Sequence, residues 1–150
     1  MTACVAFAGW RDATAARELV VRSDGPAAAY QPGRFFAREL PYLEAALVRL
    51  GEPLAAALVD GYVWLGDGVP GLGAHLHAAL GGAVAVVGVA KSRYRGAPAI
   101  EVVRGDSRRP LYVTAAGLDA AEAAAHVRAM HGPHRIPALV KRADTLARQP

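Results

Sequence analysis

The sequence contains a single cysteine, Cys4, so no disulfide can form within the chain. Small secreted domains usually depend on several disulfides, and a chain without them fits a reducing compartment. No apolar run reaches the roughly 20 residues that a membrane span needs, and no basic start precedes a signal-type apolar stretch. These absences predict a soluble, cytoplasmic protein and argue against a membrane partner.

Internal repeats, low-complexity tracts and interdomain linkers are also missing from the 150 residues. A chain of this length can bury a substantial core, so we expect one domain that spans residues 1–150. Alanine supplies much of the apolar content. The periodicity of the larger apolar residues therefore has to identify the secondary structure.

Acidic residues are scarce in the second part of the chain. Residues 91–150 carry 11 basic and 5 acidic side chains, whereas residues 1–90 carry 6 basic and 8 acidic ones. A basic half is expected of a protein with a polyanionic partner such as nucleic acid. A solvated surface in an arginine-rich protein gives the same counts, so charge alone leaves both interpretations open.

Two short apolar runs end in charged residues. Leu54–Val59 is followed by Asp60, and Ala83–Ala90 is followed by Lys91. Runs this short, bounded by glycine or proline, predict strands that are buried on both faces. Ligands of open α/β sheets bind beyond the carboxyl ends of the strands. The sequence therefore predicts a site that contains Asp60 and Lys91, although an ion pair that caps two strands would explain the same residues.

A helical stripe of apolar residues follows a Pro-Gly pair, with steps of four and three between residues 36 and 50. Glu39 lies on this stripe, three residues after Phe36 and four before Leu43. Pro41 either kinks the helix or marks a new first turn. Burying a carboxylate without a partner is costly, so an inward-facing Glu39 needs a cation, a metal or hydrogen-bond donors.

The whole pattern predicts an α/β fold in which an antiparallel meander precedes β-α-β units and helices flank a mixed sheet. This is the layout of a ribonuclease H-like fold, whose enzymes usually bind divalent metal with carboxylates near the centre of the sheet. The predicted order is strands at 3–8, 15–22 and 27–30, a helix at 36–50, a strand ending at 60, a loop at 61–73, a helix at 74–80, a strand ending at 90, a hairpin of 100–104 and 111–114, and helices at 119–131 and 136–148.

Several short strings stand in a fixed order along the chain: Tyr30-Gln-Pro-Gly33, Phe36-Ala-Arg-Glu-Leu-Pro41, Leu58-Val-Asp-Gly61, Gly71-Leu-Gly-Ala-His75, Val87-Gly-Val-Ala-Lys-Ser92, Arg135-Ile-Pro137 and Arg142-Ala-Asp144. Together they resemble the endonuclease V family over almost the whole core. The resemblance implies a magnesium-dependent nuclease with a ribonuclease H-like fold. Members of that family recognise deaminated bases, chiefly inosine, in DNA or RNA, and cut one nucleotide beyond the lesion on its 3′ side.

The resemblance also implies roles for individual residues. Glu39 and Asp60 match metal-binding carboxylates, which implies a magnesium or manganese cofactor, and Lys91 matches a lysine near the scissile phosphate. His75 matches a position beside the metal site. A further motif of the family separates the nucleic-acid strands as a wedge and lines the pocket for the lesion base. The residues that match this wedge are Tyr30, Gln31, Pro32 and Gly33.

Arg93, Tyr94 and Arg95 follow the strand that ends before Lys91. Basic residues on both sides of an aromatic one suit a nucleic-acid backbone and a stacked base. A solvated loop gives the same spacing, so the triplet is a candidate contact for DNA or RNA and no more.

The chain departs from the family's pattern at three positions. The first strand of the family carries a metal-binding aspartate, whereas Val5-Ala-Phe-Ala8 has no carboxylate, and Asp12 substitutes only if the hairpin folds back. The two histidines of the family fall on Gly66 and Gly117. The retained residues favour weak binding of one magnesium, or none, over two-metal chemistry.

Three functions stay open at this point. The first is an endonuclease V-like nuclease, with weakened or altered activity on inosine-containing or modified nucleic acid. The second is a nucleic-acid-binding module without catalysis, which recognises nucleic acid through the basic second half of the chain. In such a degenerate site Glu39 could pair with Lys91 or Arg38 in a buried charge network. The third is a pocket for a nucleoside-like small molecule. The retained acids and lysine favour the first, and the oligomeric state is left open.

Overall fold

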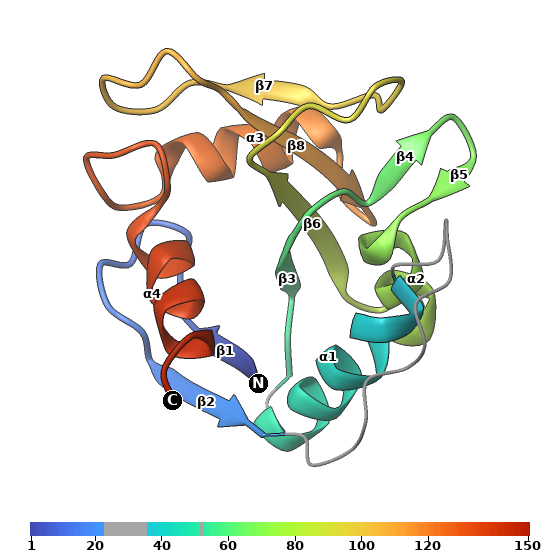
Figure 1. Ribbon diagram of the computed structural model, residues 1–150, viewed down its shortest axis with the longest axis vertical. Helices are drawn as coiled ribbons and strands as arrows, with labels where there is room; N and C mark the ends of the chain where they lie inside the picture. Colours follow the sequence, from blue (N-terminus) through green and yellow to red (C-terminus); the bar gives the residue numbers. More distant parts are fainter. Residues whose placement is uncertain (23–35, 52) are drawn as a thin grey trace.

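A four-stranded mixed sheet lies at the centre of the computed structural model, which describes residues 1–22, 36–51 and 53–150 (Figure 1). Helices flank the sheet, so the expected α/β class is confirmed. The elements are β1 (Thr2–Ala6), β2 (Arg17–Val21), α1 (Phe36–Leu50), β3 (Ala56–Asp60), β4 (Trp64–Gly66), β5 (Val69–Pro70), α2 (Leu72–Ala79), β6 (Ala85–Ala90), β7 (Ile100–Val102), β8 (Leu111–Ala116), α3 (Ala120–Ala129) and α4 (Ala138–Ala147).

The strands of the central sheet follow the order β3-β6-β8-β7. β3 and β6 are parallel. The segment between them, which contains α2, returns the chain to the end of the sheet at which β3 begins. β8 pairs antiparallel with β6 on one side and with β7 on the other. The pattern therefore contains the expected β-α-β unit and the expected late hairpin.

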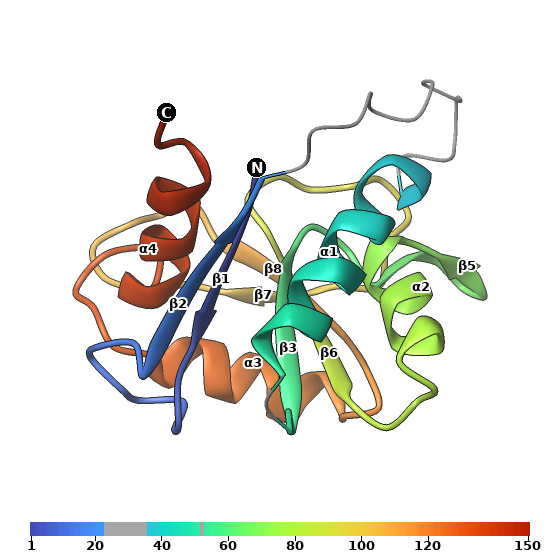
Figure 2. The same cartoon turned by 90° about the horizontal axis from the view of Figure 1, so that it is seen from below.

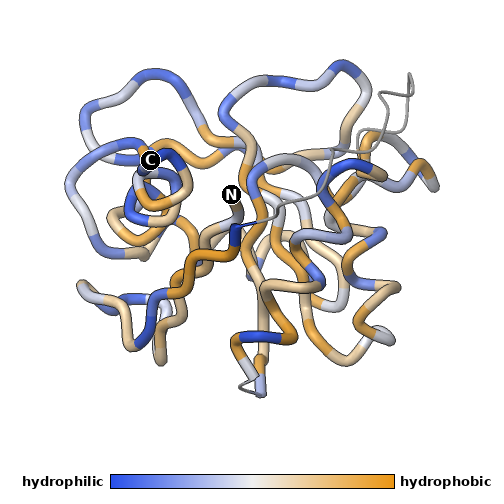
Figure 3. Tube along the Cα trace, turned by 60° about the horizontal axis from the view of Figure 1, so that its bottom comes forward, coloured by the Kyte–Doolittle hydropathy of each residue, from blue (hydrophilic) through white to orange (hydrophobic). Residues whose placement is uncertain are grey.

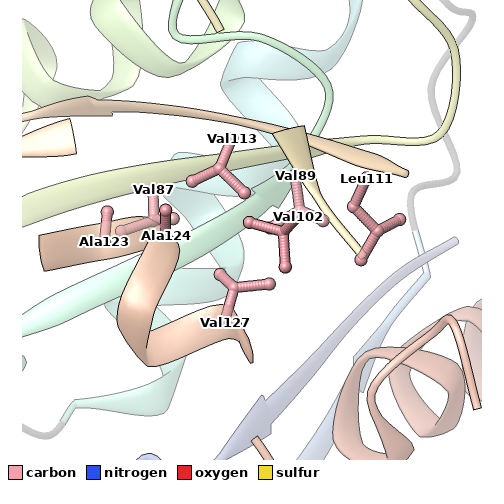
Figure 4. Close-up of a cluster of buried hydrophobic side chains, with 8 residues drawn as sticks. All are labelled: Val87, Val89, Val102, Leu111, Val113, Ala123, Ala124 and Val127. Atoms are coloured by element: carbon pink, nitrogen blue, oxygen red, sulfur yellow. The ribbon is translucent and has the colours of Figure 1, made fainter. Parts of the chain in front are cut away.

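One face of the sheet packs on α3. Side chains from β6, β7, β8 and α3 point toward one another in this layer (Figure 4). Val87, Val102 and Val113 are fully buried there. Asp119 caps the helix, since its side chain accepts a hydrogen bond from the backbone N–H of Ala121 at 2.9 Å.

The opposite face packs on α1 and α2. Leu40, Leu43 and Leu47 of α1 cover a buried cluster that includes Val86 of β6 and Leu76 of α2. This is the stripe predicted from the sequence. Pro41 lies inside α1 and is exposed, so it neither ends the helix nor begins it.

The first two strands form a separate two-stranded sheet. β1 and β2 pair antiparallel, and within the described residues neither is hydrogen-bonded to the central sheet (Figure 2). Side chains fasten this hairpin instead. Arg142 of α4 donates two hydrogen bonds to the carboxylate of Glu18, and the Trp10 ring stacks on His126 with centroids 4.7 Å apart. The expected third strand of the meander, at 27–30, lies outside the described residues.

Two expectations about the elements are wrong. β3 was expected to be buried on both faces, yet only Val59 is buried, because β3 is an edge strand of the central sheet. Residues 61–73 were expected to form a loop, yet they contain the short β4–β5 hairpin and the start of α2. Gly68 turns that hairpin with a φ of 66°, a conformation that glycine adopts without strain.

Hydrophobic residues are concentrated along the strands in the middle of the molecule, and hydrophilic residues lie in the outer loops (Figure 3). In the part of the chain that the structure describes, no helix combines the length and apolar character needed to cross a bilayer.

The core packing predicts a large cost for truncating Leu76, which is 1% exposed between α2 and the sheet. Leu76→Ala should lower the free energy of unfolding by about 2–5 kcal/mol, because the transfer energy is lost and a cavity remains. Val48→Ala is the matched control, since Val48 is 79% exposed on α1 and its loss should change little. Urea denaturation of both variants measures the difference, and equal midpoints would contradict this packing.

Candidate active site

The parallel pairing of β3 and β6 brings Asp60 and Lys91 to one edge of the sheet. Asp60 is in register with Val89, and the backbone N–H of Gly61 donates to the carbonyl of Val89 at 3.1 Å. Lys91 follows Val89 by two residues. Alternate residues of a strand share a face, so Asp60 and Lys91 leave the sheet on the same side.

The bend after Asp60 rests directly on β6 at Gly88. A Cβ atom at Gly88 would lie 2.5 Å from the carbonyl oxygen of Gly61, so a larger residue cannot occupy this position without a shift. The buried hydroxyl of Thr114 accepts a hydrogen bond from the N–H of Val63 at 2.8 Å. These two contacts fix the direction of the chain beyond Asp60.

A cavity of about 940 Å³ opens beside this edge, between β1 and β3 and against α1 and α4. Its lining is largely apolar, but it includes the side chains that the sequence singled out, Glu39, Asp60 and Lys91. Glu39 comes from the first turn of α1, whereas Asp60 and Lys91 come from the strand ends. The structure therefore brings the three residues to one cavity.

The charged groups of this cavity are not paired with one another. Glu39 and Asp60 are exposed and Lys91 is partly buried, and none of the three forms an ion pair within the described part of the chain. The proposed burial of Glu39 is therefore wrong, because the apolar stripe of α1 packs on the sheet while Glu39 faces the open cavity. The alternative in which Lys91 neutralises buried acids is not found.

Asp144 is a fourth charged residue of the cavity, which sequence reasoning did not select as a site residue. It lies on α4, and its carboxylate is 3.3 Å from the guanidinium of Arg148, one turn later on the same helix. Its place in the Arg142-Ala-Asp144 string was the signal that could have found it.

Tyr62 holds the loop that follows Lys91. Its hydroxyl donates a hydrogen bond to the carbonyl of Ser92 at 2.7 Å and accepts one from the N–H of Tyr94 at 2.8 Å. Tyr62 is 8% exposed, and its burial raises the pKa of the phenol. The Tyr94 ring lies against Tyr62 and remains 50% exposed, so it is available to solvent.

The two arginines beside Tyr94 differ in their surroundings. Arg93 approaches Glu101 at 3.7 Å, and both side chains are mostly exposed. Exposed pairs of this kind contribute little. Arg95 is exposed and has no ion pair among the described residues.

Arg104 and Arg135 tie the segments around Lys91 together. Arg135 donates to the carbonyls of Lys91 at 2.6 Å and Pro110 at 2.8 Å through one nitrogen, and to Arg109 at 2.9 Å through Nε. Arg104 lies two residues after β7. It donates hydrogen bonds to four carbonyls of the α3–α4 connection, those of Met130, Gly132, His134 and Arg135.

Three solved structures to which this chain is similar are endonucleases V. The enzyme of Streptomyces avermitilis shares 28% identity with a TM-score of 0.65, and the match covers 80% of this chain and 61% of that one. The enzyme of Bacillus subtilis shares 20% identity with a TM-score of 0.69 over 82% and 62%. That of Ciona intestinalis, solved with a 23mer DNA containing an inosine followed by a ribo-adenosine, shares 19% identity with a TM-score of 0.65 over 81% and 66%.

This chain has the fold of endonuclease V. It spans less than two thirds of the length of these structural relatives. No family model and no curated protein matches its sequence.

The expected gap in the endonuclease V pattern is visible in β1. The cavity is lined there by Thr2, Ala3, Cys4, Val5 and Ala6, none of which carries a carboxylate. The carboxylate of Asp12 accepts hydrogen bonds from the N–H groups of Ala8 and Gly9, both at 3.0 Å. Asp12 therefore stabilises the turn after β1 and does not replace a metal ligand.

Unlike Glu39 and Asp60, neither His75 nor the wedge residues can be assigned to the cavity. The His75 ring stacks on Phe36, with centroids 3.6 Å apart, and is not part of the cavity lining. A role beside the metal stays a prediction for His75. The wedge residues Tyr30, Gln31, Pro32 and Gly33 lie outside the described residues, so their role is likewise a prediction.

The residues of the cavity can be tested against the needs of a magnesium ion. Magnesium is commonly held by one or two carboxylates, with waters and substrate phosphates completing six oxygen ligands. Glu39 and Asp60 supply that number of carboxylates. Within the described ranges no three of the His, Cys, Asp and Glu side chains are grouped to hold one ion. The donor set therefore fits a single, hydrated ion that needs the substrate for its remaining ligands, and it does not fit a two-metal centre.

The Tyr62 contacts predict a stability effect that depends on pH. Tyr62→Phe should lower the free energy of unfolding by about 1–3 kcal/mol near pH 7, since two hydrogen bonds are lost. The raised pKa means that the unfolded chain loses the phenol proton first, so Tyr62 stabilises the fold fully below pH of about 10 and progressively less above it. Urea titrations from pH 7 to 11 should show the two proteins converging, and a constant difference would exclude this role.

Proposed function

We propose that this protein is an endonuclease V-like nuclease that hydrolyses a phosphodiester in inosine-containing or otherwise modified nucleic acid. The observation that carries the proposal is the placement of Glu39, Asp60 and Lys91 on one cavity at the carboxyl ends of β3 and β6. Ligands of such sheets bind at this edge. The fold shared with endonucleases V, one of them solved with inosine-containing DNA, supports it.

Each residue has a distinct task in this proposal. Glu39 and Asp60 would hold one magnesium or manganese ion. An ion bound there supplies Lewis acidity toward the phosphate and lowers the pKa of a bound water. Lys91 places a positive charge where negative charge develops on the phosphate. Tyr62 keeps the Lys91 loop in position, so the charge does not have to be reorganised during the reaction.

The base and its neighbours require other contacts. The exposed ring of Tyr94 can stack on an unpaired base, and Arg95 can reach the backbone. Tyr30 to Gly33 would separate the strands beside the lesion. Extruding a base costs least where its pairing is already weakened, which is the physical basis for selecting a deaminated base.

One observation favours a second candidate function. β1 brings no carboxylate to the cavity, so the metal has at most two protein ligands from the residues assigned here. A protein with the same surface and too weak a metal site would bind nucleic acid without cutting it. The two functions share the substrate and differ only in turnover.

The nuclease proposal predicts loss of cleavage when either carboxylate becomes an amide. Glu39→Gln and Asp60→Asn should each reduce the cleavage of an inosine-containing oligonucleotide by more than about 100-fold in magnesium or manganese, because losing a ligand exceeds the 10–100-fold typical of its supporting groups. Glu44→Gln on the same helix and Asp67→Asn in the β4–β5 turn are matched controls that should cut like the unaltered protein.

The outcomes separate the candidates. Binding of the oligonucleotide without cleavage in either metal assigns the non-catalytic function. Cleavage that survives both Glu39→Gln and Asp60→Asn places the chemistry elsewhere. Absence of both binding and cleavage removes the proposal.

A further inference from the structure

Two guanidinium groups in the described part of this region donate hydrogen bonds only to neutral acceptors. Arg104 is 5% exposed, and its hydrogen bonds all go to backbone carbonyls; its burial lowers the pKa of the guanidinium. Arg135 likewise bonds only to carbonyls, and neither arginine forms an ion pair among the described residues. Carbonyls accept from the terminal nitrogens of Arg104, whereas its buried Nε has no hydrogen-bond partner among the described residues, and neutral carbonyls do not cancel a guanidinium charge. The region therefore keeps a positive potential.

The strand register places the β7–β8 turn next to Lys91. Ala90 pairs with Tyr112, so the chain that precedes β8 runs beside Lys91 at the same end of the sheet. The shared nitrogen of Arg135 confirms the proximity, because it contacts the carbonyl oxygens of both Lys91 and Pro110. The residues immediately before Pro110 are Arg108 and Arg109.

Arg108 and Arg109 are exposed, and in the described ranges neither forms an ion pair. Asp106 is the acid of the same turn, and it leaves the turn with a net positive charge. Backbone contacts hold Arg109 in place. Arg135 binds the carbonyl of Arg109, and the Ser107 hydroxyl accepts from the N–H of Arg109 at 3.2 Å.

The turn is also packed against the α3–α4 connection (Figure 1). Gly105 has a φ of 60°, and a Cβ atom there would collide with the carbonyl oxygen of Pro133. Arg104 donates hydrogen bonds to carbonyls of the connection. Arg135, which belongs to the connection, donates hydrogen bonds to carbonyls of the turn. Hydrogen bonds thus connect the turn, the connection and the backbone of Lys91.

We propose that Arg108 and Arg109 form a second phosphate-binding surface for the nucleic-acid strand whose reacting phosphate lies at Lys91. The proposal rests on the proposed function, since it takes nucleic acid as the ligand, but it does not require cleavage. Arg104 and Arg135 set the spacing between the two contacts. The surface reads the backbone and not the bases, so it strengthens binding equally for modified and unmodified strands.

The test compares two double variants that remove the same charge. Arg108→Gln/Arg109→Gln alters the proposed surface. Arg22→Gln/Arg49→Gln alters two exposed arginines that lie beside Met1 and Pro150. In Figure 1 the two chain ends lie at the opposite end of the molecule from β7. Fluorescence anisotropy measures the affinity for one oligonucleotide with inosine and one with guanosine, in EDTA and in calcium, between 50 and about 300 mM salt, with thermal melting as the check on folding.

Arg108→Gln/Arg109→Gln should reduce the slope of log affinity against log salt by roughly 1.4–1.8, the value for two lost phosphate contacts, with equal losses for both oligonucleotides. The control pair should keep the slope of the unaltered protein. Equal behaviour of the two pairs, or a loss confined to the inosine strand, overturns this inference and leaves the proposed function standing. If the unaltered protein binds neither oligonucleotide, the proposed function fails and this surface with it.

Discussion

The parallel alignment of β3 with β6 is the constraint on which the candidate site depends. It alone determines that a carboxylate from one strand and an ammonium from the next leave the sheet at the same edge and on the same side. Gly88 permits this alignment, because the chain after Asp60 passes over β6 at a residue without a side chain. A Cβ atom at Gly88 would clash with the carbonyl oxygen of Gly61. α1 then needs only to present Glu39 from the neighbouring wall of the cavity.

Most of the secondary structure was predictable because each element carries its own periodicity. The stripe of α1 and the apolar run of β6 correspond to observed elements, and the helix expected at 119–131 corresponds to α3. The burial of β3 was not predictable, since an apolar run does not say which strand will lie at the edge of a sheet. β4 and β5 were missed because they are short and glycine-rich, so their sequences show no strand periodicity. Their strand conformation depends on the antiparallel pairing of one with the other.

In the candidate site, too, some residues could be predicted from the sequence and others could not. Asp60 and Lys91 were found because they end apolar runs, whereas the exposure of Glu39 depends on how α1 lies over the sheet. The contacts of Arg104 and Arg135 could not be predicted, since their acceptors are carbonyls, which every residue has, 25 to 44 positions away along the chain. Long-range bonds to the backbone leave no mark on the sequence of the acceptor.

The separation of the β1–β2 hairpin from the central sheet has a mechanical consequence. The hairpin wall of the cavity is attached by packing on α1 and α4 and by side-chain contacts, which include Arg142 with Glu18, Arg17 with the carbonyl of Leu50 and the Trp10–His126 stack, while the opposite wall belongs to a continuous ladder of backbone hydrogen bonds. The exposed ion pair between Glu18 and Arg142 weakens as salt rises, so the attachment of this wall depends on ionic strength and the backbone ladder of the other wall does not. Of the two walls of the cavity, the β1–β2 hairpin is therefore the one whose position depends on side-chain contacts. The edge that carries Asp60 and Lys91 is held by the backbone of the central sheet.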